Sequence, residues 1–309
     1  MVTAPELEAS KRFNAAVSMV KKPAPSYFRF MLGAFEITVF LDGTIPCAMD
    51  QLLTNTTPER VHELLAASFE KDPYEMSFHC YLVNTGARLI LIDAGGAILG
   101  GPNLGNLAPL LKLSGYRPEQ IEEIYMTHLH DDHIGGLTHQ EQAVFPHAVL
   151  RVSKVDADFW LNEKNVAGTR PELQAYFLTA MSAVKPYSDA GRFRTFDADQ
   201  ELSPGVRSQA LYGHSPGHSG FVIESEGQTL EIWGDVLHSI EVQMTDPQTT
   251  FVFDYDPEMA MRRRREKLED AVTKGYLIAS AHVTFPGLGH LLRAANGYRW
   301  LPVSYTVIR

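Results

Sequence analysis

The segment THLHDDHIGG, residues 127–136, concentrates imidazole and carboxylate side chains in a chain that has 12 histidines in 309 residues. His128 and His130 lie two apart just after the apolar run IEEIYM, so side chains leaving a strand end can converge on one cation. Asp132 and His133 follow at once and can serve a second cation beside the first. Burying these groups unpaired would be unfavourable. Imidazole and carboxylate together suit zinc, and also manganese, iron or cobalt.

Three further candidate ligands end later apolar runs. His214 lies in LYGHSPGH, Asp235 in EIWGDVLH and His282 in LIASAH. The alternative is an exposed loop that happens to be rich in His and Asp. The dense HxHxDH pattern and the three later candidates favour a metal centre at the ends of several strands.

These motifs, in this order, resemble the metallo-β-lactamase superfamily. Longer stretches are similar to its methyl parathion hydrolase and dihydrocoumarin hydrolase branch, from about residue 28 to the end: DAGG, GYRPEQIEEIYMTHLHDDHIGG, ADFWL, GHSPGH and KGYLIASAHVTFPGLGH. The resemblance implies an αββα sandwich of two similar halves with a metal site at one edge. It also implies a homodimer.

The resemblance further implies a set of seven ligands. One ion would be bound by His128, His130 and His214, the other by Asp132, His133 and His282, with Asp235 bridging both. Within GHSPGH the family ligand is the first histidine, His214, so His218 is expected to contact the ligands without binding an ion. Near the C-terminus, His290 is the less favoured alternative to His282. Members of the superfamily often read TPGH where this chain has LYGH. The resemblance therefore does not predict the backbone geometry just before His214.

Such a centre suits hydrolysis. Two divalent ions that share a water lower its pKa towards about 7, and the more exposed ion polarises the substrate oxygen. We therefore expect a metal-bridging hydroxide as the nucleophile, with Asp132 and Asp235 as the catalytic carboxylates. Asp93, in IDAGG, is expected to accept a ligand imidazole N–H, the alternative being a turn cap. The leftover residue, Asp131, is expected to face solvent or a partner behind the ligands.

Aromatic residues further along the chain are candidates for the substrate pocket, although each could equally pack in the core. They are Trp160, Tyr176, Phe177, Phe251 and Phe253, together with His238. If they line the pocket, they favour a flat lactone or aryl ester over a bulky phosphotriester. We expect a dihydrocoumarin hydrolase-like enzyme with phosphotriester hydrolysis as a side reaction; the alternative is a primary phosphotriester hydrolase.

Other classes fit less well. A di-iron redox protein of this fold usually has a carboxylate in place of His130 and a flavin domain, and neither is present. The chain has 27 Lys plus Arg against 37 Asp plus Glu, and this net charge of -10 disfavours nucleic acid and anionic membranes as partners. No window approaches the roughly 18 apolar residues of a membrane span, so a cytoplasmic location is expected, or a periplasmic one if a leader was removed.

The remaining features concern the fold. Cys47 and Cys80 are expected to be buried free thiols, or alternatively one disulfide. The basic run 262–265 is expected on the wet face of a helix, the alternative being a phosphate-binding patch.

Strands and helices alternate throughout, which predicts one layered α/β domain over residues 28–309 after an N-terminal extension, 1–27. We expect hairpins in 28–43, 79–96 and 221–235, strands in 121–128 and 276–282, a strand running into a helix in 148–162, and helices after Thr57 and in 105–116.

Overall fold

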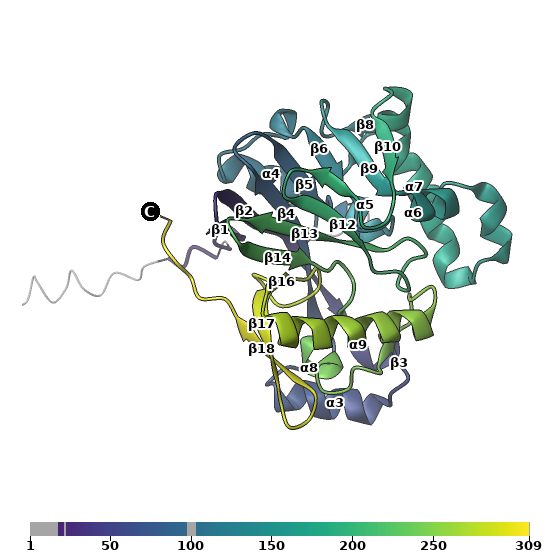
Figure 1. The fold of residues 1–309 in the computed structure, drawn as a ribbon. Helices are drawn as coiled ribbons and strands as arrows, with labels where there is room; N and C mark the ends of the chain where they lie inside the picture. The colour runs from purple at the N-terminus through teal and green to yellow at the C-terminus, as the bar shows by residue number, and fades with distance from the viewer. Residues whose placement is uncertain (1–17, 22, 98–102, 309) are drawn as a thin grey trace, which may run out of the picture.

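Two seven-stranded sheets form the centre of the computed structural model, which describes residues 18–21, 23–97 and 103–308 (Figure 1). The first sheet, in spatial order, contains β1 (Tyr27–Leu32), β2 (Phe35–Cys47), β4 (Tyr74–Asn84), β5 (Leu89–Ile92), β6 (Glu123–Tyr125), β9 (Val149–Ser153) and β10 (Phe193–Phe196). The second contains β11 (Glu201–Ser203), β12 (Val206–Ala210), β13 (Ser219–Ser225), β14 (Gln228–Ile232), β16 (Leu277–Ala279), β17 (Leu288–Arg293) and β18 (Tyr298–Pro302). Two short ribbons pair β3 (Leu53–Thr54) with β15 (Thr250–Phe251) and β7 (Thr138–His139) with β8 (Gln142–Ala143).

Helices pack around the two sheets. They are α2 (Met49–Leu52), α3 (Pro58–Ala67), α4 (Leu107–Leu113), α5 (Asp131–Ile134), α6 (Lys154–Trp160), α7 (Pro171–Asp189), α8 (Ile240–Gln243) and α9 (Pro257–Lys274), with 3-10 helices η2 (Pro118–Gln120) and η3 (Glu163–Gly168). Buried side chains of α4, α6 and α7 pack on the first sheet. Leu268 and Ala271 of α9 pack on the second.

Strand β4 shows how the sequence builds the sandwich. Cys80 and Leu82 point to the helix-covered face, whereas Tyr81 and Val83 point to the layer between the sheets. That layer also contains Phe221 and other residues of the second sheet. Because β4 is buried on both faces, its apolar run is continuous rather than alternating. The predicted αββα layering is therefore confirmed.

Most predicted elements are present. The hairpins turn at Gly33 and at Glu226–Gly227, and α3 begins after Thr57, whose side chain accepts the backbone N–H of Arg60. The strand expected over 121–128 is shorter, Glu123–Tyr125, and a loop that carries His128 and His130 follows it. The predicted extension 1–27 lies largely outside the described residues, and β1 begins at Tyr27.

Two expectations about single residues need correction. Both cysteines are free, as expected, but only Cys80 is fully buried, while Cys47 is half-buried. In the basic run, Arg262 and Arg265 are exposed, but Arg264 is buried because it lies on the inward face of α9.

Within the described part of the chain, no helix has the length and hydropathy needed to cross a membrane.

Candidate metal centre and substrate cavity

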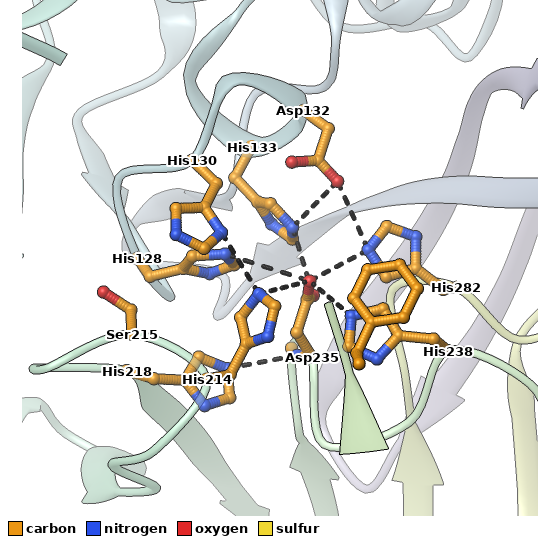
Figure 2. A network of polar contacts seen from close by, with 12 residues as sticks. His128, His130, Asp132, His133, His214, Ser215, His218, Asp235, His238 and His282 are labelled. Atoms are coloured by element: carbon orange, nitrogen blue, oxygen red, sulfur yellow. Dashed lines mark hydrogen bonds and ion pairs between the residues drawn. The ribbon is translucent and has the colours of Figure 1, made fainter. Parts of the chain in front are cut away.

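The seven predicted ligands meet at one edge of the sandwich, where loops leave the strands (Figure 2). His128 and His130 follow β6, and Asp132 and His133 lie on α5. The other three come from the second sheet: His214 after β12, Asp235 after β14 and His282 after β16. Both halves of the molecule thus contribute ligands to one cluster.

The cluster contains two groups of donor atoms that correspond to the predicted ligand sets, and a third group, His214, Asp235 and His238, overlaps them. In one, donor atoms of His128, His130 and His214 lie within 4.8 Å of one another. In the other, the same limit holds for Asp132, His133, Asp235 and His282. These are the two groups that the resemblance implied.

Asp235 lies between the two groups. Its Oδ2 is 3.2 Å from Nε2 of His214 and 3.0 Å from Nε2 of His282, while its Oδ1 is 3.1 Å from Nε2 of His133. The carboxylate therefore reaches donors of both groups, as a bridging ligand must.

Four histidines are fixed through Nδ1, so that Nε2 points into the cluster. Their Nδ1 partners are Asp93 for His133, Asp254 for His214, the Ser77 carbonyl for His282 and the Thr127 hydroxyl for His128. Such contacts behind a ligand orient the ring and make it a better donor.

The donor atoms of the cluster are of the types that bind divalent ions. Nε2 of His128 and Nε2 of His130 are buried without a hydrogen-bond partner among the described residues, and Nε2 of His133 and Oδ1 of Asp235 face each other at 3.1 Å without forming a hydrogen bond. Orphaned polar atoms in a native core are rare, since each is unfavourable. Nitrogen and carboxylate oxygen at this spacing are the ligands that zinc prefers.

The charges of the cluster also suit divalent cations. Burial opposes protonation of His214 and His282, yet the carboxylate of Asp235 outweighs it and raises the pKa of these rings to about 9 and about 10. Burial lowers the pKa of His128 and His130, aided by neighbouring imidazoles, so these two are neutral donors. The carboxylates thus stabilise positive charge at the centre of the cluster.

Two predicted supporting residues lie behind the ligands. Asp93 accepts the backbone N–H of Thr127 at 2.8 Å and contacts Nδ1 of His133, also at 2.8 Å. His218 contacts the Leu211 carbonyl through Nδ1 and accepts the Asp235 N–H through Nε2, so neither nitrogen is free for an ion.

A cavity of about 180 Å³ opens onto the cluster. Its apolar wall is formed by β2, α2 and β4 through Ile45, Cys47, Leu52, Met76 and Phe78. The predicted pocket residues Tyr176, His238, Phe251 and Phe253 also line it, and Tyr176 stacks on His130 with ring centroids 4.3 Å apart. A larger cavity, of about 730 Å³, lies against the C-terminal segment and away from the cluster.

Trp160 and Phe177 do not line this cavity, which corrects the prediction for both. They are fully buried in the core beside the first sheet. Trp160 donates its indole N–H to the Ser215 hydroxyl and packs edge-on against His130, so it supports the ligand loops from behind.

Asp131 also differs from expectation. It is half-buried and lines the cavity, and burial raises the pKa of its carboxyl to about 6.

Two buried carboxylates were missed by sequence reasoning. Asp254 contacts His214 from the loop after β15. Asp156, on α6, accepts the N–H groups of Leu129 and Gly217 and the Ser215 hydroxyl, and so ties together the two histidine loops. Each is a single Asp in an unremarkable context, and only the adjacent ADFWL motif pointed near Asp156.

Comparison with known proteins agrees with this geometry. The family model of the metallo-beta-lactamase superfamily matches residues 77–281, and the chain belongs to this superfamily. It is a metal-dependent hydrolase with ligands for two divalent ions.

Three similar proteins illustrate the relationship. The crystal structure of the hydrolase AbOPH, of the beta-lactamase superfamily, is 34% identical with a TM-score of 0.88, covering 93% of this chain and 100% of its own. AidC, a dizinc quorum-quenching lactonase in complex with a product, is 26% identical with a TM-score of 0.84. The match covers 91% of this chain and 99% of the AidC chain. An N-acyl homoserine lactonase of Bacillus thuringiensis is 25% identical over an alignment 218 residues long, which covers 63% of this chain and 76% of that protein.

Proposed function

We propose that this protein is a dinuclear hydrolase of lactones that also accepts aryl esters. The observation that carries the proposal is the position of the Asp235-centred ligand cluster at the base of a small cavity with an apolar and aromatic wall. Such a wall favours a compact apolar substrate whose one polar group, the ester, lies at the cluster. The likeness to AidC and to the Bacillus lactonase supports a lactone as that substrate.

The seven donors from both sheets would hold the ions, most favourably Zn²⁺, with manganese, iron and cobalt as alternatives. When bound, two divalent ions supply a Lewis acid and a strongly acidified water. Asp235 sets the spacing between the two donor groups, and His218 fixes its backbone N–H at 3.1 Å.

His238 is the proposed hydrogen-bond donor to the substrate oxygen. Its Nε2 lies 3.3 Å from Oδ2 of Asp235, neither ring nitrogen forms a hydrogen bond among the described residues, and the ring lines the cavity. Burial lowers its pKa to about 4, so it is neutral at pH 7 and carries one N–H. Tyr176 is held as a neutral phenol because burial raises its pKa.

A substrate panel tests the proposal and its finer parts. The purified protein is assayed with an N-acyl homoserine lactone, dihydrocoumarin, phenyl acetate and methyl paraoxon, with metal content measured in parallel. We expect kcat/KM to be highest for a lactone and lowest for the phosphotriester. A phosphotriester preference would instead support the methyl parathion hydrolase-like alternative, and full activity in metal-free protein would refute the proposal.

Two further predictions accompany this proposal. Placement in the methyl parathion hydrolase and dihydrocoumarin hydrolase branch predicts activity on dihydrocoumarin. The same resemblance predicts a homodimer, which light scattering of the eluted protein measures directly.

A further inference from the structure

The segment 236–251 connects the bridging Asp235 to β15 and carries two cavity residues. His238 lies near its start and Phe251 at its end. Their rings are stacked, with centroids 3.9 Å apart and planes inclined by 14°. The position of the His238 ring at the cluster therefore depends on how this segment is held.

Arg264 holds the segment from α9. Its side chain is 1% exposed, and its guanidinium donates to the carbonyl oxygens of Val236 at 2.7 Å, Pro247 at 3.3 Å and Thr249. Among the described residues no carboxylate forms an ion pair with it, so its buried charge is satisfied by backbone carbonyls. Because a buried charge is unfavourable unless it is satisfied, these three carbonyls are fixed relative to one another.

Gln243 holds the same segment from inside. Its side chain is fully buried; Oε1 accepts the N–H groups of His238 at 2.7 Å and Ser239 at 3.3 Å, and Nε2 donates to the Thr249 carbonyl at 3.2 Å. The Thr249 carbonyl thus receives hydrogen bonds from both Gln243 and Arg264. The two side chains form one clamp that joins both ends of the segment.

The clamp has a consequence at the cluster. With its backbone N–H fixed and its ring stacked on Phe251, His238 places Nε2 3.3 Å from Oδ2 of Asp235. Neither clamp residue lines the cavity.

We propose that Arg264 and Gln243 are positioning residues for the hydrolytic reaction, acting by holding the His238 ring at the cavity. This inference rests on the proposed function, in which His238 contacts the substrate. A displacement of about 1 Å in a group that contacts the transition state can lower a rate roughly 100-fold. The clamp therefore supports catalysis without touching substrate or ions.

Substitution of the clamp tests this role. Gln243→Met removes both polar groups at similar length, and Arg264→Met removes the guanidinium; Arg265→Met, at an exposed position on the same helix, is the matched control. We expect the two clamp variants to remain folded with wild-type metal content, and to lose about 10- to 100-fold in kcat/KM. Arg264→Lys retains a donor and should recover part of the loss, while Arg265→Met should equal the wild type.

A double-mutant cycle separates positioning from general destabilisation. In a His238→Ala background, Gln243→Met should cause little further loss, because the group that it positions is already absent. A full additional loss, or wild-type kinetics in both clamp variants, would overturn the inference.

A crystal structure of Gln243→Met gives a readout that needs no activity, and so distinguishes failure of the clamp from failure of the proposed function. A displaced His238 ring supports the clamp, and an unmoved ring refutes it, even if the wild type hydrolyses no lactone.

Discussion

Asp254 Oδ1 lies 2.8 Å from Nδ1 of His214, which joins two residues 40 positions apart in the chain. The other oxygen of Asp254 accepts the backbone N–H of Phe251 at 2.8 Å. One buried carboxylate therefore orients a metal donor and fixes part of the cavity wall. Contact with His214 outweighs burial and lowers the pKa of Asp254, so it is ionised at neutral pH.

Loss of this carboxylate should weaken metal binding. Asp254→Asn removes the charge that raises the basicity of the His214 ring, and changes of this kind lower metal affinity about 10- to 100-fold. Competition with a chromophoric chelator measures the affinity. Asp158→Asn is the control, since Asp158 is exposed and, among the residues that the structure describes, forms an ion pair only with Lys154 across one helical turn. Equal affinity in the two variants would contradict the prediction.

The residues of the cluster were predicted from the sequence better than their surroundings, for a physical reason. His128, His130, Asp132 and His133 are nearly contiguous, so one short segment of the sequence is enough to reveal them. Asp254 and Asp156 act alone, each from a segment with no pattern, and their role depends on tertiary contacts.

Aromatic residues were ambiguous for a related reason. Tyr176 and Phe177 are neighbours on α7, yet Tyr176 lines the cavity and Phe177 is in the core, because successive positions on a helix point in different directions. Arg264 differs from Arg265 in the same way. A layered α/β domain was predictable because the alternation of strands and helices is a local feature, whereas the αββα sandwich was implied by the resemblance to the superfamily.

Removal of metal should destabilise the protein. Chelation leaves the negative charges of Asp132 and Asp235 without a cation. The neighbouring imidazoles must then take up protons to neutralise these charges. An ion present at 100 times its Kd stabilises the folded state by about 2.7 kcal/mol per site. We expect Tm to fall on chelation and to recover with added Zn²⁺, as measured by calorimetry. His128→Ala and Asp235→Asn should have low Tm and low activity with or without added metal; a normal Tm in both would exclude this centre.

The two cysteines should differ in reactivity. Burial raises the pKa of the Cys47 thiol from its ordinary 9.0 to about 11, and Cys47 lines the cavity. Its alkylation by iodoacetamide should be slow at pH 8, accelerate up to about pH 11 and decrease when a lactone product occupies the cavity. Cys80, fully buried, should react only on unfolding. Peptide mass analysis identifies each site, and rapid labelling of both at pH 8 would contradict the assignment.

The raised pKa of Cys47 also predicts how this residue affects the stability of the fold. The folded state retains the thiol proton more strongly than the unfolded chain does. Below about pH 9 the thiol is protonated in both states, so Cys47 does not change the free energy of unfolding with pH. Between about pH 9 and pH 11 the unfolded chain ionises first, and the contribution of Cys47 to the free energy of unfolding falls. A Cys47→Ser variant, compared by urea denaturation across this range, should show a smaller decline than the wild type.

Gly234, directly before Asp235, is expected to tolerate no side chain. Its φ is +54°, and a Cβ there would lie 2.6 Å from Nε2 of His218, the atom that accepts the Asp235 N–H. Gly234→Ala therefore combines an unfavourable left-handed backbone with a clash that should displace the Asp235 carboxylate. Gly227→Ala is a matched control, because its φ is +77° but nothing lies within 4 Å of a Cβ.

The control should lose about 1–2 kcal/mol in the free energy of unfolding, which is the contribution of the left-handed backbone alone. Gly234→Ala should lose about 1–3 kcal/mol more through overpacking, and should also lose metal and activity, which the control should retain. Urea denaturation and metal analysis of both variants measure these differences. If the two variants lose equal stability and Gly234→Ala binds as much metal as the control, then the hydrogen bond from the Asp235 N–H to His218 does not position the Asp235 carboxylate.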